Sequence, residues 1–109
     1  MSVMLVRQKV KDGSVEAAEA AARELFATLD RVRPQGLRYA STRVVDSSTF
    51  VILTELADGI QDPRPAIPEF LGFLEQLKGW VDGPPVLEHL EIVGTYALFV
   101  TQPEDSAVR

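Results

Sequence analysis

The chain of 109 residues contains no cysteine, which excludes disulfide bonds, thiolate zinc sites, iron–sulfur clusters and a cysteine nucleophile. It has a single histidine, so a histidine-based metal site would need carboxylates for most of its ligands. The glycines are isolated from one another and form neither the Walker nor the Rossmann phosphate-binding pattern. From these absences we expect no bound metal and no cofactor.

Basic residues and long apolar runs are also scarce. Lys and Arg number 11 against 16 Asp and Glu, without a basic block, so nucleic acid would have to bind against the net negative field. No run approaches the roughly 20 apolar residues of a membrane span, and the N-terminus lacks the pattern of a signal peptide. We therefore predict a cytoplasmic protein with neither nucleic acid nor a membrane as partner.

Apolar residues make up 46% of the chain, which suffices for one modest core. The spacing of these residues alternates along the chain between the period of a strand and the period of a helix. The predicted segments are a strand at 3–10, a helix at 15–33, strands at 37–46 and 49–57, a helix at 68–78 and a strand at 86–100. The order βαββαβ is that of the ferredoxin-like motif, an α+β fold with an antiparallel sheet. We expect one domain over residues 1–100 and a flexible tail at 101–109.

Residues that favour helix ends bracket both helical segments. Ser14 is placed as the N-cap of the first helix, and Pro34 with Gly36 ends it. Pro68 suits the first turn of the second helix, and Gly79 is expected to cap its end.

The two middle strands are predicted to form a hairpin around residues 46–49. We expect Val45 opposite Phe50 and Arg43 opposite Ile52, and directly paired residues share a face. The face expected beneath the helices is small or aliphatic: Ala40, Thr42, Val44, Val51 and Leu53. The face expected to meet a partner or a cavity is apolar with hydroxyls and an arginine: Tyr39, Ser41, Arg43, Val45, Phe50, Ile52, Thr54 and Leu56.

The last predicted strand is unusually long. Its fifteen residues, 86–100, exceed the usual five or six, and Gly94 is expected to mark a bulge or bend. The apolar stretch 95–100 would be a free edge on a monomer, so we expect it to lie across a second subunit. Two helices can cover only one face of the sheet, and this too predicts a homodimer.

Few side chains in the sequence suit catalysis. His89 can act as a general base or an axial haem ligand in a pocket, or it can be a polar interface residue. Trp80 can form the wall of an aromatic pocket or plug the end of the core. Arg43, on the same face as Tyr39, can hold an anionic or phenolate ligand. Alternatively, an ion pair forms among Arg7, Lys9, Arg43 and Glu91.

The loop at 58–67 joins the second hairpin strand to the second helix. A loop of this length and place can be a lid through which a substrate enters. Its Pro63 and Pro65 favour a stiff rim over a moving flap.

The element order, the chain length and three segments resemble the antibiotic biosynthesis monooxygenase (ABM) domain family of the dimeric α+β barrel superfamily. The segments are Met4-Leu-Val-Arg-Gln-Lys-Val10, Phe70-Leu-Gly-Phe-Leu-Glu-Gln-Leu77 and Pro85-Val-Leu-Glu-His-Leu-Glu-Ile-Val93. The resemblance covers residues 3–100 and implies a homodimer with a hydrophobic pocket between sheet and helices. It also implies oxidation of aromatic substrates by O2 without metal or flavin. Other relatives degrade haem or have no known activity.

The spacing from Trp80 to His89, with Gly83 and Pro84 between them, is similar to that of some haem-degrading relatives. In those proteins the histidine belongs to the region of the second helix, whereas His89 lies in the closing strand. We therefore do not transfer the haem-binding roles, and haem binding or degradation stays a third interpretation.

Two main hypotheses of function follow. The first is cofactor-independent oxidation of a small aromatic or polycyclic phenol by O2, with His89 as the base and Arg7, Arg43 or Tyr39 stabilising the phenolate. The second is a non-catalytic dimeric module that binds a hydrophobic ligand or a protein. The other residues expected to line the pocket are Arg7, Phe50, Ile52, Thr54, Trp80 and Glu91.

Overall fold

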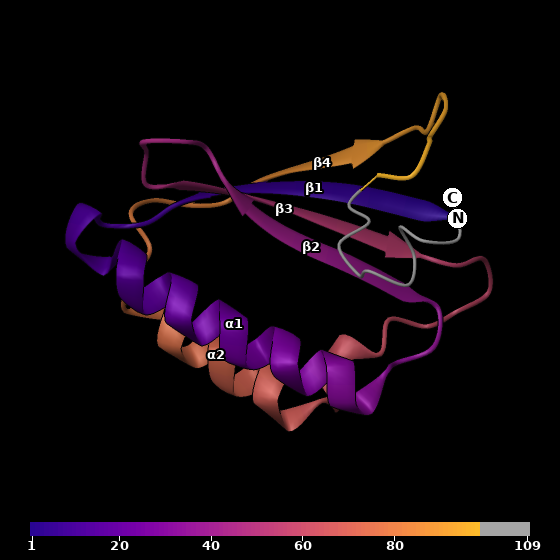
Figure 1. Ribbon diagram of the computed structural model, residues 1–109, viewed down its shortest axis with the longest axis horizontal. Coiled ribbons are helices and arrows are strands. Elements are labelled where there is room, and N and C mark those ends of the chain that lie inside the picture. The colour runs from indigo at the N-terminus through magenta and orange to yellow at the C-terminus, as the bar shows by residue number, and fades with distance from the viewer. Residues whose placement is uncertain (99–109) are drawn as a thin grey trace.

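The computed structural model describes residues 1–98 (Figure 1). The elements are β1 (Ser2–Lys9), α1 (Val15–Val32), β2 (Leu37–Arg43), β3 (Thr49–Leu56), α2 (Pro68–Lys78) and β4 (Val86–Leu90). Short 3-10 turns precede both helices, at Asp12–Ser14 and Arg64–Ala66. The predicted order βαββαβ is confirmed, while the tail predicted at 101–109 lies outside the described residues.

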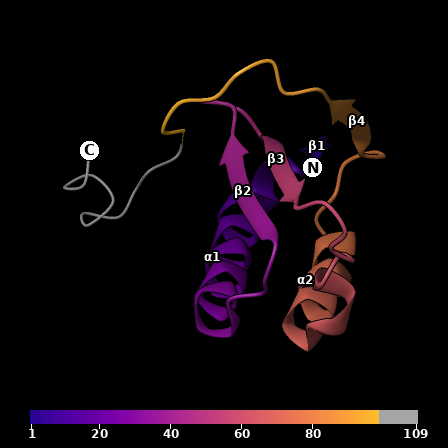
Figure 2. The same ribbon diagram turned by 90° about the vertical axis from the view of Figure 1, so that its right-hand side faces the viewer.

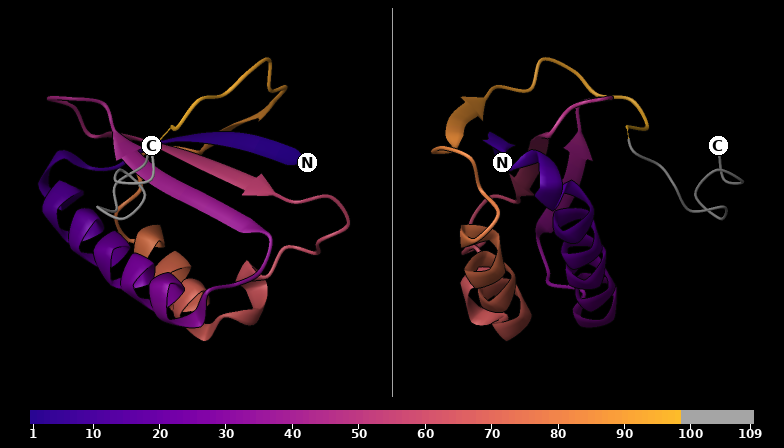
Figure 3. Two further views of the ribbon diagram at one scale, coloured as in Figure 1. Left: turned by 45° about the vertical axis from the view of Figure 1, so that its right-hand side comes forward. Right: turned by 90° about the vertical axis from the view of Figure 1, so that its left-hand side faces the viewer.

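The strands form one antiparallel sheet in the order β2-β3-β1-β4. Both helices lie against the same side of this sheet, as Figure 2 shows. α1 presents a stripe of buried residues at helical spacing that includes Ala18, Leu25 and Thr28. The fold is therefore a two-layer α+β arrangement, and within residues 1–98 the other side of the sheet carries no helix (Figure 3).

The helices end much as their sequences predict. α1 stops where Arg33 adopts a left-handed conformation, with φ of 50°, and donates its backbone N–H to the carbonyl of Leu29. Pro68 occupies the first turn of α2, and the N–H of Gly79 caps the other end. The hydroxyl of Ser14 makes no capping hydrogen bond, because a 3-10 turn leads directly into α1.

The register of the β2–β3 hairpin differs from the predicted one by two residues. Phe50 lies opposite Arg43 where Val45 was expected. The connection is longer because Val44 and Val45 belong to it: the N–H of Val44 bonds the carbonyl of Thr49 at 2.9 Å. A shift of two keeps every side chain on its predicted set, because strand side chains alternate with period two.

The side of the sheet that faces the helices is the reverse of the predicted one. Phe50 is buried in a core cluster with Val10 and Ala18, and Tyr39 packs against a second cluster that contains Leu25. The set with hydroxyls and aromatic rings therefore lies beneath the helices, and the small aliphatic set with Leu53 lies on the open side. Phe50 and Tyr39 bury large apolar rings in this position, which favours placing their side of the sheet against the helices. The expectation that this set meets a cavity agrees with the structure.

The prediction of a fifteen-residue closing strand is wrong over its described part. β4 ends at Leu90, which pairs with Val3 near the beginning of β1. β4 is an edge strand with β1 as its neighbour, so it ends where β1 begins. Residues 91–98 leave the sheet as a loop (Figure 3), and Val93 and Tyr96 are 99% and 91% exposed. Residues 99 and 100 lie outside the described part of the chain.

Candidate functional site

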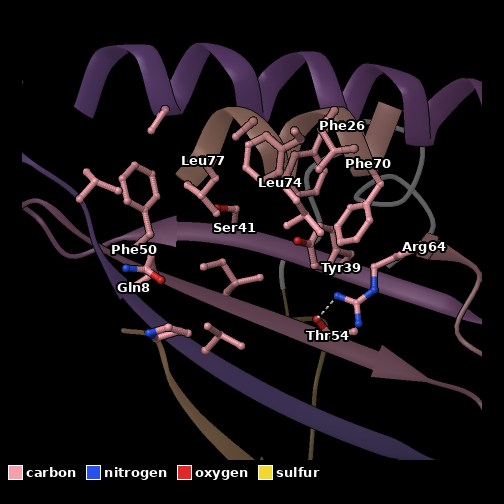
Figure 4. Close-up of a pocket in the computed structure, with 18 residues that line it drawn as sticks. Gln8, Phe26, Tyr39, Ser41, Phe50, Thr54, Arg64, Phe70, Leu74 and Leu77 are labelled. Carbon is pink, nitrogen blue, oxygen red and sulfur yellow. Dashed lines mark hydrogen bonds between the residues drawn. The ribbon is translucent and has the colours of Figure 1, made fainter. Parts of the chain in front are cut away.

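A cavity of about 250 Å³ lies between the sheet and the two helices. Figure 4 shows its lining side chains, most of which come from β1, β2, β3 and both helices, while Val10, Arg64 and Pro85 come from the connections between them. Small side chains leave this space open: Ala18 and Ala22 on α1 and Ser41 on β2. Most of the wall is apolar or aromatic, and the residues with polar side-chain atoms are Gln8, Tyr39, Ser41, Thr54 and Arg64. An apolar cavity with a few placed polar groups is the usual form of a small-molecule site.

Arg64 is the one charged residue in the wall that the described residues build, and its side chain is only 12% exposed. Its Nε lies 3.0 Å from Oδ1 of Asp62, and its Nη2 lies 2.7 Å from Oδ2 of the same carboxylate. Its Nη1 donates a 3.1 Å hydrogen bond to Oγ1 of Thr54. The fork-shaped contact balances the arginine charge, which is what a largely buried guanidinium requires.

Aromatic rings complete this corner of the cavity. The guanidinium carbon of Arg64 lies 5.3 Å from the ring centre of Tyr39 and 5.5 Å from that of Phe70, which are cation–π distances. Tyr39 in turn stacks on Phe26 with ring centres 5.4 Å apart. Arg64, Asp62, Tyr39 and Thr54 are called the polar corner below.

The loop before α2 holds Arg64 in this place by local chemistry. Asp62 accepts the backbone N–H of Arg64 at 3.0 Å, which forms a tight turn, and prolines on both sides stiffen it. Ile60, near the start of this loop, packs against Gly36, which comes just before β2 and has a φ of 80°. A Cβ atom added at position 36 would lie only 2.7 Å from the side chain of Ile60. These contacts hold the loop against the sheet, while its stiffness stays a prediction from the prolines.

Burial and charge set the protonation of the polar corner. Burial raises the pKa of Tyr39 in spite of the attraction of Arg64, so the phenol stays protonated at neutral pH. Hydrogen bonds from the Arg64 side chain hold the pKa of Asp62 below its usual value, so this carboxylate stays ionised. Arg64 itself remains a cation.

At the other end of the cavity lies Gln8, which is 6% exposed. Its Nε2 donates to the carbonyl of Lys9 at 2.8 Å and to that of Gly83 at 3.1 Å. These two bonds fix the orientation of the amide, because only the Nε2 of Gln8, and not its Oε1, can donate a hydrogen bond to a carbonyl oxygen.

Four residues expected in the site line the cavity: Tyr39, Phe50, Ile52 and Thr54. Trp80 packs beside the core cluster of Val10, which corresponds to the interpretation of this side chain as a core plug. Arg43 lies on the helix side but pairs with Glu19 at 3.1 Å, away from the cavity wall.

The other predicted site residues lie farther away. Arg7 is on the open side of the sheet, where its Nε lies 3.6 Å from Oε1 of Glu88. His89 pairs with Met4 and is therefore on the cavity side of β4, but it is exposed and does not line the cavity. Glu91 is exposed beyond the end of β4. The structure thus brings Tyr39 and Thr54 together with Arg64 and separates them from Arg7 and Glu91.

Sequence reasoning missed Arg64, Asp62 and Gln8. The signal that was present is an acidic and a basic residue two positions apart among prolines, Asp62-Pro63-Arg64-Pro65, in the predicted rim. Within residues 1–98, no group of three or more metal-binding side chains gathers, and no helix is long and apolar enough to cross a membrane.

Neither a protein-family model nor a curated protein matches this chain in sequence. Solved structures match in fold. A proposed antibiotic biosynthesis monooxygenase from Nitrosomonas europaea superposes with a TM-score of 0.70 over 93% of either chain at 18% identity. Another from Caulobacter crescentus gives 0.66 at 20% identity, over 85% of this chain and 90% of its own.

A protein of unknown function from Nitrosomonas europaea is similar as well, with a TM-score of 0.67 at 12% identity over 87% of this chain and 91% of its own. At such identities the likeness concerns the fold. The predicted resemblance is confirmed at that level: the chain has the ferredoxin-like α+β fold of antibiotic biosynthesis monooxygenase proteins.

Proposed function

We propose that the cavity binds a small aromatic phenol and that the protein oxidises it with O2 without a cofactor. The observation that carries this proposal is the cavity itself, an apolar space between sheet and helices with a cationic and phenolic corner at one end. Apolar walls accept both an aromatic ring system and O2. The corner offers hydrogen-bond donors to an oxygen atom of the substrate on which negative charge develops.

In the proposed reaction a phenol loses a proton, and its electron-rich ring system reduces O2 directly. For a methylene group flanked by aromatic rings, CH2 and O2 give C=O and H2O, so one oxygen atom enters the product and the other leaves as water. Arg64 and Tyr39 would stabilise the negative charge that the phenolate delocalises through its ring system onto the oxygen atom in this corner. Arg64 takes the place expected for Arg43, because Arg43 is engaged with Glu19.

The base in this proposal is His89. Arg64 is the one charged group among the described residues of the cavity wall, so proton removal needs a group from outside that wall. His89 lies on the same side of the sheet, opposite Met4 at the β4 edge. Histidine is the side chain that most often acts as a general base in enzymes.

We also propose a homodimer in which the open sides of two sheets meet. That side carries Leu5, Val51 and Leu53 in neighbouring positions of β1 and β3, and no helix of the described part of the chain covers it. The β4 side chains beside them include Val86 and Leu90, which are 55% and 40% exposed. Burial of this apolar surface against a second copy would remove it from water.

A non-catalytic ligand-binding module is the second candidate. The observation that favours it is the balanced charge of the cavity: Asp62 neutralises Arg64, and no acid or base stands free on the wall formed by the described residues. Such a cavity can hold an apolar molecule without changing it.

One experiment separates the two candidates. A hydroxyanthrone is added to the purified protein, and O2 uptake and quinone absorbance are followed, while a stable hydroxyanthraquinone reports binding by fluorescence. Oxidation predicts O2 uptake above the buffer rate, unchanged by a chelator. Binding without O2 uptake supports the module.

A cavity-filling variant locates the site. Ala22 faces the cavity from α1, so Ala22→Trp should abolish binding, whereas Ala27→Trp on the exposed side of the same helix should not. Equal binding by both variants would mean that the ligand lies elsewhere.

A further inference from the structure

The polar groups of the cavity lie at its two ends, and they differ in what they offer to a ligand. Figure 4 shows Gln8 at one end and Arg64 at the other. Gln8 is in register with Phe50, and Arg64 bonds Thr54, four residues farther along β3. At about 3.3 Å per strand residue these ends are separated by about 13 Å. Between them lie apolar side chains such as Ile52 and the hydroxyl of Ser41.

The Gln8 end offers a hydrogen-bond acceptor. Both contacts of its Nε2 are to backbone carbonyls, so the amide cannot turn over without placing oxygen against oxygen. The described residues give its Oε1 no partner, although the residue is 6% exposed and lines the cavity. Within the described residues, every fully buried side-chain nitrogen or oxygen has a hydrogen-bond partner, so this Oε1 is accessible, and a donor on a ligand in the cavity can bond to it.

The Arg64 end offers hydrogen-bond donors, and Asp62 balances the charge of the arginine that carries them. Hydrogen bonds from Nε, Nη1 and Nη2 use three of its five N–H groups, which leaves two for a ligand. Because the Asp62 carboxylate already balances the guanidinium, a fully charged anionic ligand group meets repulsion from Asp62 together with the attraction of Arg64, and it must also give up its hydration. A carbonyl oxygen accepts both N–H groups and brings no charge.

We infer that the cavity selects an elongated, uncharged and mostly apolar molecule with a hydroxyl or N–H donor at one end and a carbonyl acceptor at the other. The donor end meets Oε1 of Gln8, and the acceptor end meets Arg64. The inference rests on the proposed function, in that it names the ligand class of the same cavity. It also fixes the direction in which the ligand lies between the two ends.

A matched series of biphenyls tests this inference on the unaltered protein. The full probe is 4-acetyl-4′-hydroxybiphenyl, and its affinity is measured by calorimetry. 4-Acetylbiphenyl lacks the donor, 4-ethyl-4′-hydroxybiphenyl lacks the acceptor, and biphenyl lacks both. Each hydrogen bond should tighten binding about 5- to 10-fold. 4′-Hydroxybiphenyl-4-carboxylate should bind at least about 10-fold more weakly than the full probe, because it brings a charge to Asp62.

The outcomes distinguish this inference from the proposed function. If biphenyl and all substituted probes bind with the same affinity, the inference is wrong and the proposed ligand cavity stands. Tighter binding of the carboxylate than of the acetyl probe also overturns the inference. If no probe binds and none shifts the melting temperature, both proposals fail.

Two variants assign the ends. Gln8→Met should remove the advantage of the hydroxyl without changing the affinity for 4-acetylbiphenyl, and Gln76→Met on the exposed side of α2 is its control. Asp62→Asn should improve binding of the carboxylate probe about 10-fold relative to the acetyl probe, since Arg64 would then be unbalanced. If Gln8→Met lowers the affinity equally for probes with and without the hydroxyl, Gln8 does not bind the donor group of the ligand. An unchanged carboxylate preference in Asp62→Asn would overturn the charge argument.

Discussion

Arg64 donates a hydrogen bond of 3.1 Å from Nη1 to Oγ1 of Thr54, and this contact joins the loop before α2 to the middle of the sheet. Thr54 is 2% exposed, so the guanidinium reaches inward from the rim to a buried strand position. Asp62 and the two aromatic rings hold it there. The site thus depends on a loop residue and a strand residue ten positions apart in sequence.

Replacement of Thr54 by valine should weaken this attachment. Thr54→Val keeps the shape of the side chain but removes the hydroxyl that accepts from Arg64. We expect the free energy of unfolding to fall by about 1–2 kcal/mol in urea denaturation, because a partly buried charged donor loses its partner. Thr49→Val, on the same strand, should change it by less than about 0.5 kcal/mol. Equal effects of the two changes would contradict a structural role for the contact.

The Asp62–Arg64 pair should make stability depend on pH in the acid range. The pKa of Asp62 is lower in the folded chain than its usual value of 3.8, chiefly through hydrogen bonds from Arg64. Its contribution is therefore fully present above about pH 4 and is lost as the pH falls through the folded value. Asp62→Asn should lower the melting temperature at pH 6 and have a smaller effect at pH 3. Asp30→Asn, an exposed carboxylate on α1, should show no such difference.

The proposed dimer predicts that a charge on the open side of the sheet prevents assembly. Light scattering of the unaltered protein should give twice the 12.0 kDa mass of one chain. Leu53→Lys should give a monomer, since an interface of the obligate kind buries upward of about 2,000 Å² and tolerates no unpaired charge. Val45→Lys, in the exposed hairpin loop, should remain dimeric. A monomeric unaltered protein at micromolar concentration would exclude the proposed interface.

His89→Ala should separate catalysis from binding. If His89 removes the proton, the rate of phenol oxidation should fall by about 10²-fold. The side chain is exposed and lies outside the cavity wall, so the affinity for hydroxyanthraquinone and the melting temperature should not change. Glu91→Ala provides the control, two positions along the chain. An unchanged oxidation rate would remove His89 from the mechanism.

Local sequence patterns predicted most of the elements. The stripe through Ala18 and Leu25 identified α1, and Pro68 identified the start of α2, because helical periodicity and terminal residues act over a few positions. The same reasoning gave the hairpin and its two sets of side chains. Its register was wrong by two, since Val44 and Val45 look like strand residues but lie in the connection.

The candidate site was predicted only in part. Tyr39, Phe50, Ile52 and Thr54 were expected in a pocket and line the cavity. Their common set followed from strand alternation, which sorts residues into two faces but does not say which face meets the helices. Gln8 was read as an ordinary strand residue, because nothing near it in sequence shows that Gly83 fixes its amide.

Local patterns in the amino-acid sequence were enough to predict the order of the elements, their approximate ends and the grouping of strand side chains, because each depends on neighbours within one or two turns. The side of the sheet that the helices cover, the end of β4 and the composition of the polar corner could be seen only in the folded chain. β4 ends where β1 begins, and Arg64 lines the cavity because Asp62 and Thr54 accept hydrogen bonds from its side chain. These outcomes depend on contacts between segments distant in the chain, and no local pattern encodes such contacts.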